Sequence, residues 1–73
     1  MYTAERKPKM NLAYLKEQRK RKNLTQKEVA ETIGISHIAY RFLETGKRNT
    51  SLEILVKLVK ILELDANKLL NIN

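Results

Sequence analysis

The side chains that could do chemistry in this 73-residue sequence are mostly basic: fifteen Lys and Arg oppose eight Asp and Glu, a net charge of +7. Eight of the fifteen lie in residues 1–22 beside two Glu, so this segment alone carries +6. Such an excess on a small domain is typical of a protein that binds a polyanion, most often nucleic acid. Charge alone is equally well explained by solubility.

The sequence gives little support for catalysis, metal binding or membrane insertion. The sequence has no cysteine and one histidine, His37, so we expect no disulfide, no metal site and no cofactor. It has no nucleophile beside a base and no glycine-rich phosphate loop, so we predict that the chain is not an enzyme. No apolar run approaches the roughly 18 residues of a membrane span, and the N-terminus lacks the apolar region of a signal peptide. We therefore expect a cytoplasmic protein without a membrane partner.

Two short helices joined by a tight turn are predicted for residues 25–46. Thr25 and Glu28 form a capping box, in which each side chain binds the backbone N–H of the other, so a helix is expected at 26–33. Gly34 ends this helix, because the left-handed conformation that often follows a helix favours glycine.

The second helix of this pair is predicted for residues 37–44. Ser36 is a good N-cap, and Gly46 closes the helix as Gly34 closes the first. Apolar residues at helical spacing turn both helices toward a common core: Val29, Ala30, Ile33, Tyr40 and Leu43.

Three further helices are predicted at residues 11–22, 51–62 and 66–71. A second capping box, formed by Thr50 and Glu53, starts the helix at 51–62. The residues that this helix is expected to bury are Leu52, Leu55, Leu58, Val59 and Leu62. Because no strand pattern occurs, the predicted fold class is all-α, a compact five-helix domain.

The domain is expected to span residues 11–73, after a flexible basic N-terminal arm at 1–10. The arm shows no periodic pattern and contains the only proline. Its Arg6, Lys7 and Lys9 could follow a phosphate backbone or enter a minor groove. A solubilising tail explains the same composition.

The pattern of residues 26–46 resembles the helix-turn-helix of the phage Cro/repressor family, the Xre-like group. The matching residues are Gln26, Val29, Ala30, Ile33, Gly34, Ile35, Ser36, Tyr40, Leu43, Glu44 and Gly46. In this family a small residue at the position of Ala30 lets the two helices cross closely, and a glycine at that of Gly34 makes the turn. The resemblance covers about residues 11–70 and implies a lambda-repressor-like fold with double-stranded DNA as the partner.

The resemblance also implies which side chains contact DNA, because the second helix of the motif enters the major groove. By position, the residues expected to read bases are Ser36, His37, Ile38, Arg41 and Phe42. Those expected to hold phosphates are Thr25, Gln26, Lys47 and Arg48. Arg41 can bind guanine through two hydrogen bonds, His37 can donate to guanine or phosphate, and Ile38 suits a thymine methyl group.

Phe42 departs from the family, which usually has a polar residue at this position. With Ile38, four residues earlier, it forms an apolar pair on a face that should be exposed. Three interpretations stay open: the pair contacts thymine methyl groups and sugar, it belongs to the core of a rotated helix, or it binds another protein.

Two further expectations come from the resemblance. The residues that match a partly buried ion pair of the family are Arg19 and Glu44. Family members usually bind DNA as two-fold dimers, so a homodimer is expected. The candidates for the dimer surface are Ile61, Leu64, Leu70 and Ile72. The same residues could equally close the core.

The sequence thus predicts a sequence-specific double-stranded DNA-binding transcriptional regulator, a repressor that reads the major groove as a dimer. The alternative is a DNA-binding antitoxin or adaptor that binds a protein partner through Ile38 and Phe42. A stable complex with a protein partner that forms without DNA would distinguish this alternative from the transcriptional regulator.

Overall fold

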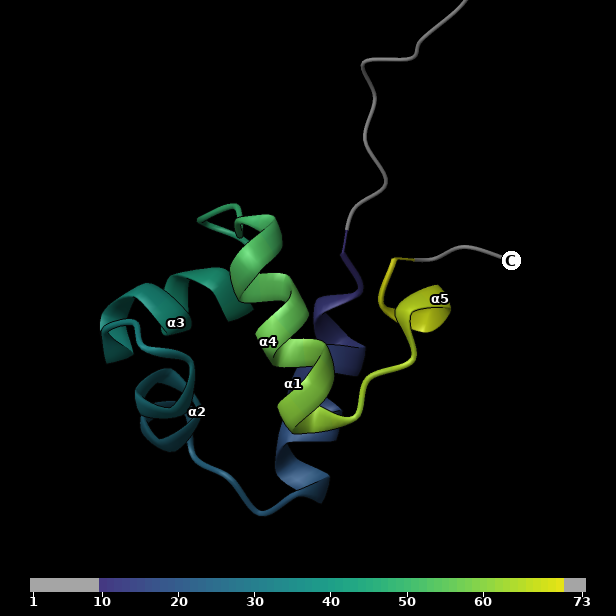
Figure 1. Ribbon diagram of the computed structural model, residues 1–73, viewed down its shortest axis with the longest axis horizontal. Coiled ribbons are helices and arrows are strands. Elements are labelled where there is room, and N and C mark those ends of the chain that lie inside the picture. Colours follow the sequence, from purple (N-terminus) through teal and green to yellow (C-terminus); the bar gives the residue numbers. More distant parts are fainter. Residues whose placement is uncertain (1–9, 71–73) are drawn as a thin grey trace, which may run out of the picture.

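The computed structural model describes residues 10–70, which fold into five helices without a β-strand (Figure 1). The helices are α1 (Leu12–Arg21), α2 (Gln26–Ile33), α3 (His37–Glu44), α4 (Leu52–Leu62) and α5 (Ala66–Leu69). The prediction of an all-α, five-helix domain is confirmed. The expected arm at 1–10, apart from Met10, and residues 71–73 lie outside the described residues. No helix in the described part is long and apolar enough to cross a membrane.

Side-chain caps fix where most of these helices begin. Thr25 and Glu28 form the predicted capping box at α2, with Thr25 Oγ1 accepting from Glu28 N at 3.1 Å and Glu28 Oε1 accepting from Thr25 N at 2.8 Å. Ser36 Oγ accepts from Ala39 N at 3.0 Å and starts α3. Asn11 and Asp65 cap α1 and α5 in the same way. These contacts are local, which is why the sequence reveals them.

The start of α4 differs from the prediction. Ser51, not Thr50, is the N-cap, and its Oγ accepts from Ile54 N at 3.2 Å. Glu53 then stands one position too early to complete a capping box, so the predicted Thr50–Glu53 box is wrong. Leu52 becomes the first residue of the helix and is 76% exposed, so its predicted place in the core is wrong as well.

The core lies where α2 and α3 cross and pack against α1 and α4. Its buried apolar residues are Leu15, Val29, Ala30, Ile33, Tyr40, Leu43, Leu58, Leu62, Leu64 and Leu69. Ala30 is buried at the crossing of α2 and α3, as expected for a small residue at this position. Leu64 is buried in the core and Ile61 is half-buried against the core, so these two candidates for a dimer surface contribute to closing the core, whereas Ile72 lies outside the described residues.

The C-terminal part is held to α1 by polar contacts. Asn11 N donates to Leu69 O at 2.6 Å, and the hydroxyl of Tyr14 accepts from Asp65 N at 2.8 Å. Lys22 at the end of α1 pairs with Glu63, which adopts the left-handed conformation after α4. Figure 1 accordingly shows α5 on the side of the molecule opposite α3.

Replacing the two turn glycines by alanine should destabilise the protein to different extents. Gly34 and Gly46 both have φ +82°, so an alanine at either position costs about 1–2 kcal/mol of strain. A Cβ at Gly34 meets no atom within 4 Å, whereas one at Gly46 lies 3.0 Å from Leu12 Cδ1. Gly46→Ala should therefore lose about 1 kcal/mol more than Gly34→Ala in urea unfolding. Equal losses would mean that Leu12 moves aside freely.

Candidate nucleic-acid interface

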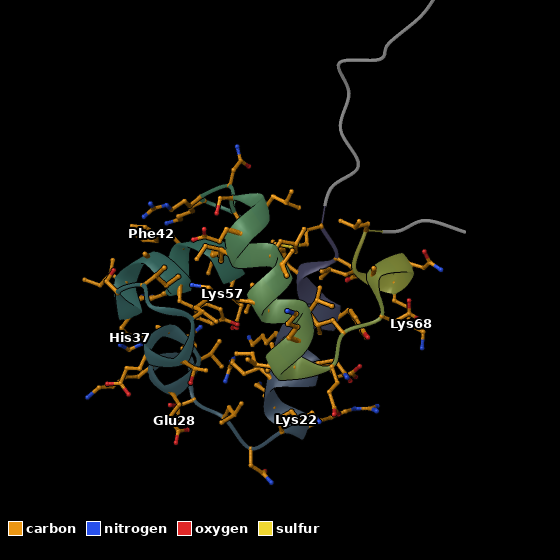
Figure 2. The ribbon with its side chains drawn as sticks, viewed as in Figure 1. Lys22, Glu28, His37, Phe42, Lys57 and Lys68 are labelled. Atoms are coloured by element: carbon orange, nitrogen blue, oxygen red, sulfur yellow. The ribbon has the colours of Figure 1, made fainter. Side chains whose placement is uncertain are left out.

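The exposed face of α3 is formed by four of the five residues predicted to read bases. His37, Ile38, Arg41 and Phe42 are exposed, while Tyr40 is buried on the opposite side of the helix. Figure 2 shows His37 and Phe42 at the edge of the molecule that α3 forms, opposite the edge where α5 carries Lys68. These four side chains can therefore contact one partner together.

Ser36, the fifth of these residues, lies at the N-terminus of α3. Its oxygen is used as the cap, which leaves its O–H free to donate. Ser36 and Arg48 line the same hollow, between the start of α3 and the loop that leads to α4. The structure thus brings a basic loop residue to the first turn of α3.

The apolar pair on α3 is not part of the core. Ile38 is 63% and Phe42 40% exposed, while Tyr40 and Leu43 are buried, so α3 is not rotated and the core interpretation is wrong. Lys47 Nζ lies 5.9 Å from the centre of the Phe42 ring, within the range of a cation–π contact. Contact with DNA and contact with a protein remain as the two interpretations of this pair.

The N-terminus of α2 offers backbone groups to an anion. Thr25 and Glu28 satisfy each other's N–H groups, which leaves those of Gln26 and Lys27 in the first turn for an outside acceptor. The side chain of Gln26, expected to hold a phosphate, donates from Nε2 to Glu44 Oε1 at 2.9 Å. Its amide is thus held in place and keeps one N–H and its oxygen for other contacts.

Arg19 and Glu44 form a buried ion pair that joins α1 to α3. Arg19 Nε donates to Glu44 Oε2 at 2.8 Å, and Nη2 donates to Oε1 at 3.1 Å. Nη1 donates to Leu24 O at 2.8 Å. Since Gln26 binds the same carboxylate, the pair also fixes the start of α2. Three of the helices that frame the candidate interface therefore meet at one carboxylate.

The carboxylate at this junction is held in its charged form. Burial by itself would raise the pKa of Glu44, but the hydrogen bonds from Arg19 and Gln26 outweigh it, so the pKa lies below the ordinary value of 4.5. Burial, with Glu44 nearby, raises the pKa of Tyr40 far above its ordinary value of 10.0. The Tyr40 oxygen is buried without a hydrogen-bond partner among residues 10–70, although Glu44 is near enough to influence its pKa.

The sequence alone did not identify two lysines that lie beside the candidate interface. Lys20 of α1 and Lys27 of α2 line one open hollow together with Gln26 and His37. Their charge was visible in the sequence, but their place in the hollow that His37 also lines depends on how the helices pack. Within the described part of the chain, no three His, Asp or Glu side chains gather in a way that could hold a metal ion.

Two short crossing helices, a glycine turn between them and an exposed face on the second define a helix-turn-helix domain. The family model described as "Helix-turn-helix" matches residues 15–69, which is most of the chain. The chain therefore belongs to the Xre-type helix-turn-helix family, as its resemblance to the Cro/repressor group implied.

One relative is similar over much of the chain. It is a protein of Archaeoglobus fulgidus named as an uncharacterized HTH-type transcriptional regulator, 38% identical over 47 residues. These residues are 64% of this chain and 66% of the relative, so the match spans just under two thirds of the relative's length. No solved structure matches the chain.

Proposed function

We propose that the protein is a sequence-specific transcriptional regulator, a repressor, that binds double-stranded DNA with α3 in the major groove. The observation that carries this proposal is the exposed face of α3, placed between two candidate phosphate-binding segments. The first is the start of α2, and the second is the loop with Lys47 and Arg48. Family membership and the HTH-type regulator from Archaeoglobus fulgidus support the same function.

The side chains of α3 suit different parts of a duplex. His37 and Arg41 can donate to guanine, and Ile38 can contact a thymine methyl group. Phe42, with Lys47 above its ring, suits the edge of the groove, where the ring meets sugar and the ammonium group meets a phosphate. No cofactor is needed, and the protein acts by occupying its site and not as an enzyme. We place it in the cytoplasm, where DNA is accessible.

We further propose that two copies bind one site. In a two-fold dimer the recognition helices lie about 34 Å apart, one turn of B-DNA. Selection from a random duplex library at a fixed salt concentration tests both proposals. Enrichment of a two-fold symmetric site with half-site centres about 10 base pairs apart is expected. Binding without enrichment would contradict sequence-specific regulation.

Truncation of the base-reading residues should change sequence preference and not only affinity. His37→Ala and Arg41→Ala are each expected to lose about 1–3 kcal/mol of discrimination at individual base pairs, because each removes a donor to a base edge. Lys47→Ala, the matched control, should weaken binding to all duplexes alike. Competition titrations with single-base variants of the selected site measure the difference. If His37→Ala and Lys47→Ala behave identically, the proposed position of α3 in the major groove is wrong.

A second candidate function rests on the exposed pair Ile38 and Phe42. A DNA-binding antitoxin or adaptor would cover this pair with a protein partner. It predicts a stable complex that forms without DNA and is lost in Ile38→Ser. If Ile38→Ser instead changes base preference and no such complex exists, the regulator is the better description.

A further inference from the structure

The outer face of α4 carries two large apolar side chains that the core does not use. Leu52 is exposed, as described above, and Val56, one turn later, is 43% exposed. They are four residues apart, so they lie side by side on the helix. In Figure 1 α4 lies in front of α1, and no other helix of residues 10–70 covers its outer side. An apolar pair of this kind on so small a domain indicates contact with another molecule.

Charged side chains of opposite sign lie at the two ends of this face. Glu53 is in the first turn of α4 and Lys60 in the last, and both are exposed. Neither forms an ion pair with another residue of the described part of the chain. Lys60 follows Val56 at the same interval at which Val56 follows Leu52, so it continues the stripe. The stripe is therefore acidic at one end, apolar at Leu52 and Val56 and basic at the other end, and the exposed Lys57 borders it beside Val56.

We propose that a second copy of this chain covers the Leu52–Val56 face, with the two α4 helices antiparallel about a two-fold axis at Val56. The inference rests on the proposed function, in which two copies share one site. Residues equally spaced on either side of Val56 then face one another, so Leu52 packs on the aliphatic stem of Lys60 of the second copy. Glu53 then faces position 59 of the second copy, which is one residue, about 1.5 Å along the helix, from Lys60 of that copy. Two Glu53–Lys60 ion pairs thus flank the Val56 contact.

Charge complementarity favours this occupant over others. Parallel α4 helices would place Glu53 against Glu53 and Lys60 against Lys60, and like charges in contact are unfavourable. A uniformly acidic or basic partner would be repelled at one end of the face. A second copy in antiparallel orientation satisfies both ends at once, because the Glu53 end and the Lys60 end are complementary to each other, and the Lys57 side chains beside the axis can extend into solvent.

The size of the face determines when the dimer forms. α4 has 11 residues, so the contact is about 16 Å long and buries less than the roughly 800 Å² per partner of a standard interface. Two free copies should therefore associate weakly. On a duplex with two half-sites the first copy raises the effective concentration of the second, so the contact should appear as cooperative binding.

The test combines sedimentation equilibrium of the full chain at millimolar concentration with titration of duplexes that carry one or two selected half-sites. Val56→Glu should weaken self-association and cooperativity at least tenfold, because two carboxylates meet at the axis. Lys60→Glu should weaken both about tenfold, and adding Glu53→Lys should restore most of the loss. Affinity for a single half-site should stay within about twofold in Val56→Glu, which shows that the fold and α3 are intact.

The proposal is overturned if Val56→Glu associates and binds cooperatively as the unmodified chain does, or if the reciprocal exchange restores nothing. It is also overturned if the unmodified chain stays monomeric and binds two half-sites without cooperativity. If no duplex is selected at all, the proposed function fails, but sedimentation of Val56→Glu and of the exchanged pair still decides whether α4 holds two copies together.

Discussion

Glu44→Ala is expected to lower the free energy of unfolding by about 3–5 kcal/mol, because it leaves Arg19 as a buried charge without its partner. The side chain of Glu44 is almost fully buried, and its two oxygens accept from Arg19 and Gln26. Urea unfolding followed by circular dichroism measures the loss. A marginally stable domain of this size could be largely unfolded by such a change.

A matched control uses an ion pair on the surface of α1, the helix that carries Arg19. Glu17 lies 3.9 Å from Arg21, and both side chains are more than half exposed. Glu17→Ala should therefore change the free energy of unfolding by less than about 1 kcal/mol. If Glu17→Ala and Glu44→Ala cost the same, burial does not set the energy of the Arg19 pair. In Arg19→Met with Glu44→Leu, part of the loss should be recovered, since no buried charge remains.

The lowered pKa of Glu44 adds a pH dependence of known sign. A carboxyl group whose pKa is lower in the folded than in the unfolded protein contributes its full stability above the unfolded value, near 4.5, and loses it as pH falls through the folded value. The protein should therefore become less stable below about pH 4.5, and Glu44→Gln should show a weaker dependence over that range. Parallel curves for the two proteins would assign the acid sensitivity to other groups.

Elements fixed by contacts close in sequence could be predicted. The capping box at Thr25, the cap at Ser36 and the left-handed Gly34 involve residues at most five apart. The start of α4 could not be predicted in this way, because Thr50 and Ser51 are both good caps. Which of them is used depends on the path of the preceding loop.

The site was predictable as a set of positions but not as a set of contacts. The residues on α3 follow from the family pattern, and their exposure follows from the burial of Tyr40 and Leu43. Features that depend on residues far apart in sequence were hidden, such as the contact of Gln26 with Glu44 and the hollow that Lys20 and His37 both line. The exposure of Leu52 could not be predicted either. An apolar residue at helical spacing is predicted to lie in the core unless the start of the helix is known.

The largest effect expected on DNA binding is its dependence on salt. A dimer that makes about 6–10 phosphate contacts should lose about 10³–10⁵-fold in affinity between 50 and 200 mM salt, because each contact releases counterions. The candidate cationic contacts are numerous enough, since Lys47 and Arg48 in the loop and Lys20 and Lys27 beside the candidate interface occur twice in a dimer, which gives eight. Titration of the selected duplex by fluorescence anisotropy at several salt concentrations measures the slope.

Lysine substitutions on opposite sides of the molecule test whether the exposed face of α3 causes the salt dependence of DNA binding. Lys47→Ala removes two cationic contacts from a dimer, so the slope of log affinity against log salt should become shallower by about 1.8. Lys68→Ala, on α5 at the edge opposite α3 (Figure 2), removes the same charge and should leave the slope unchanged. Equal flattening by both would mean that net charge, and not the α3 face, attracts DNA. An affinity that is constant from 50 to 200 mM would contradict phosphate binding altogether, because neutralised phosphates must release ions.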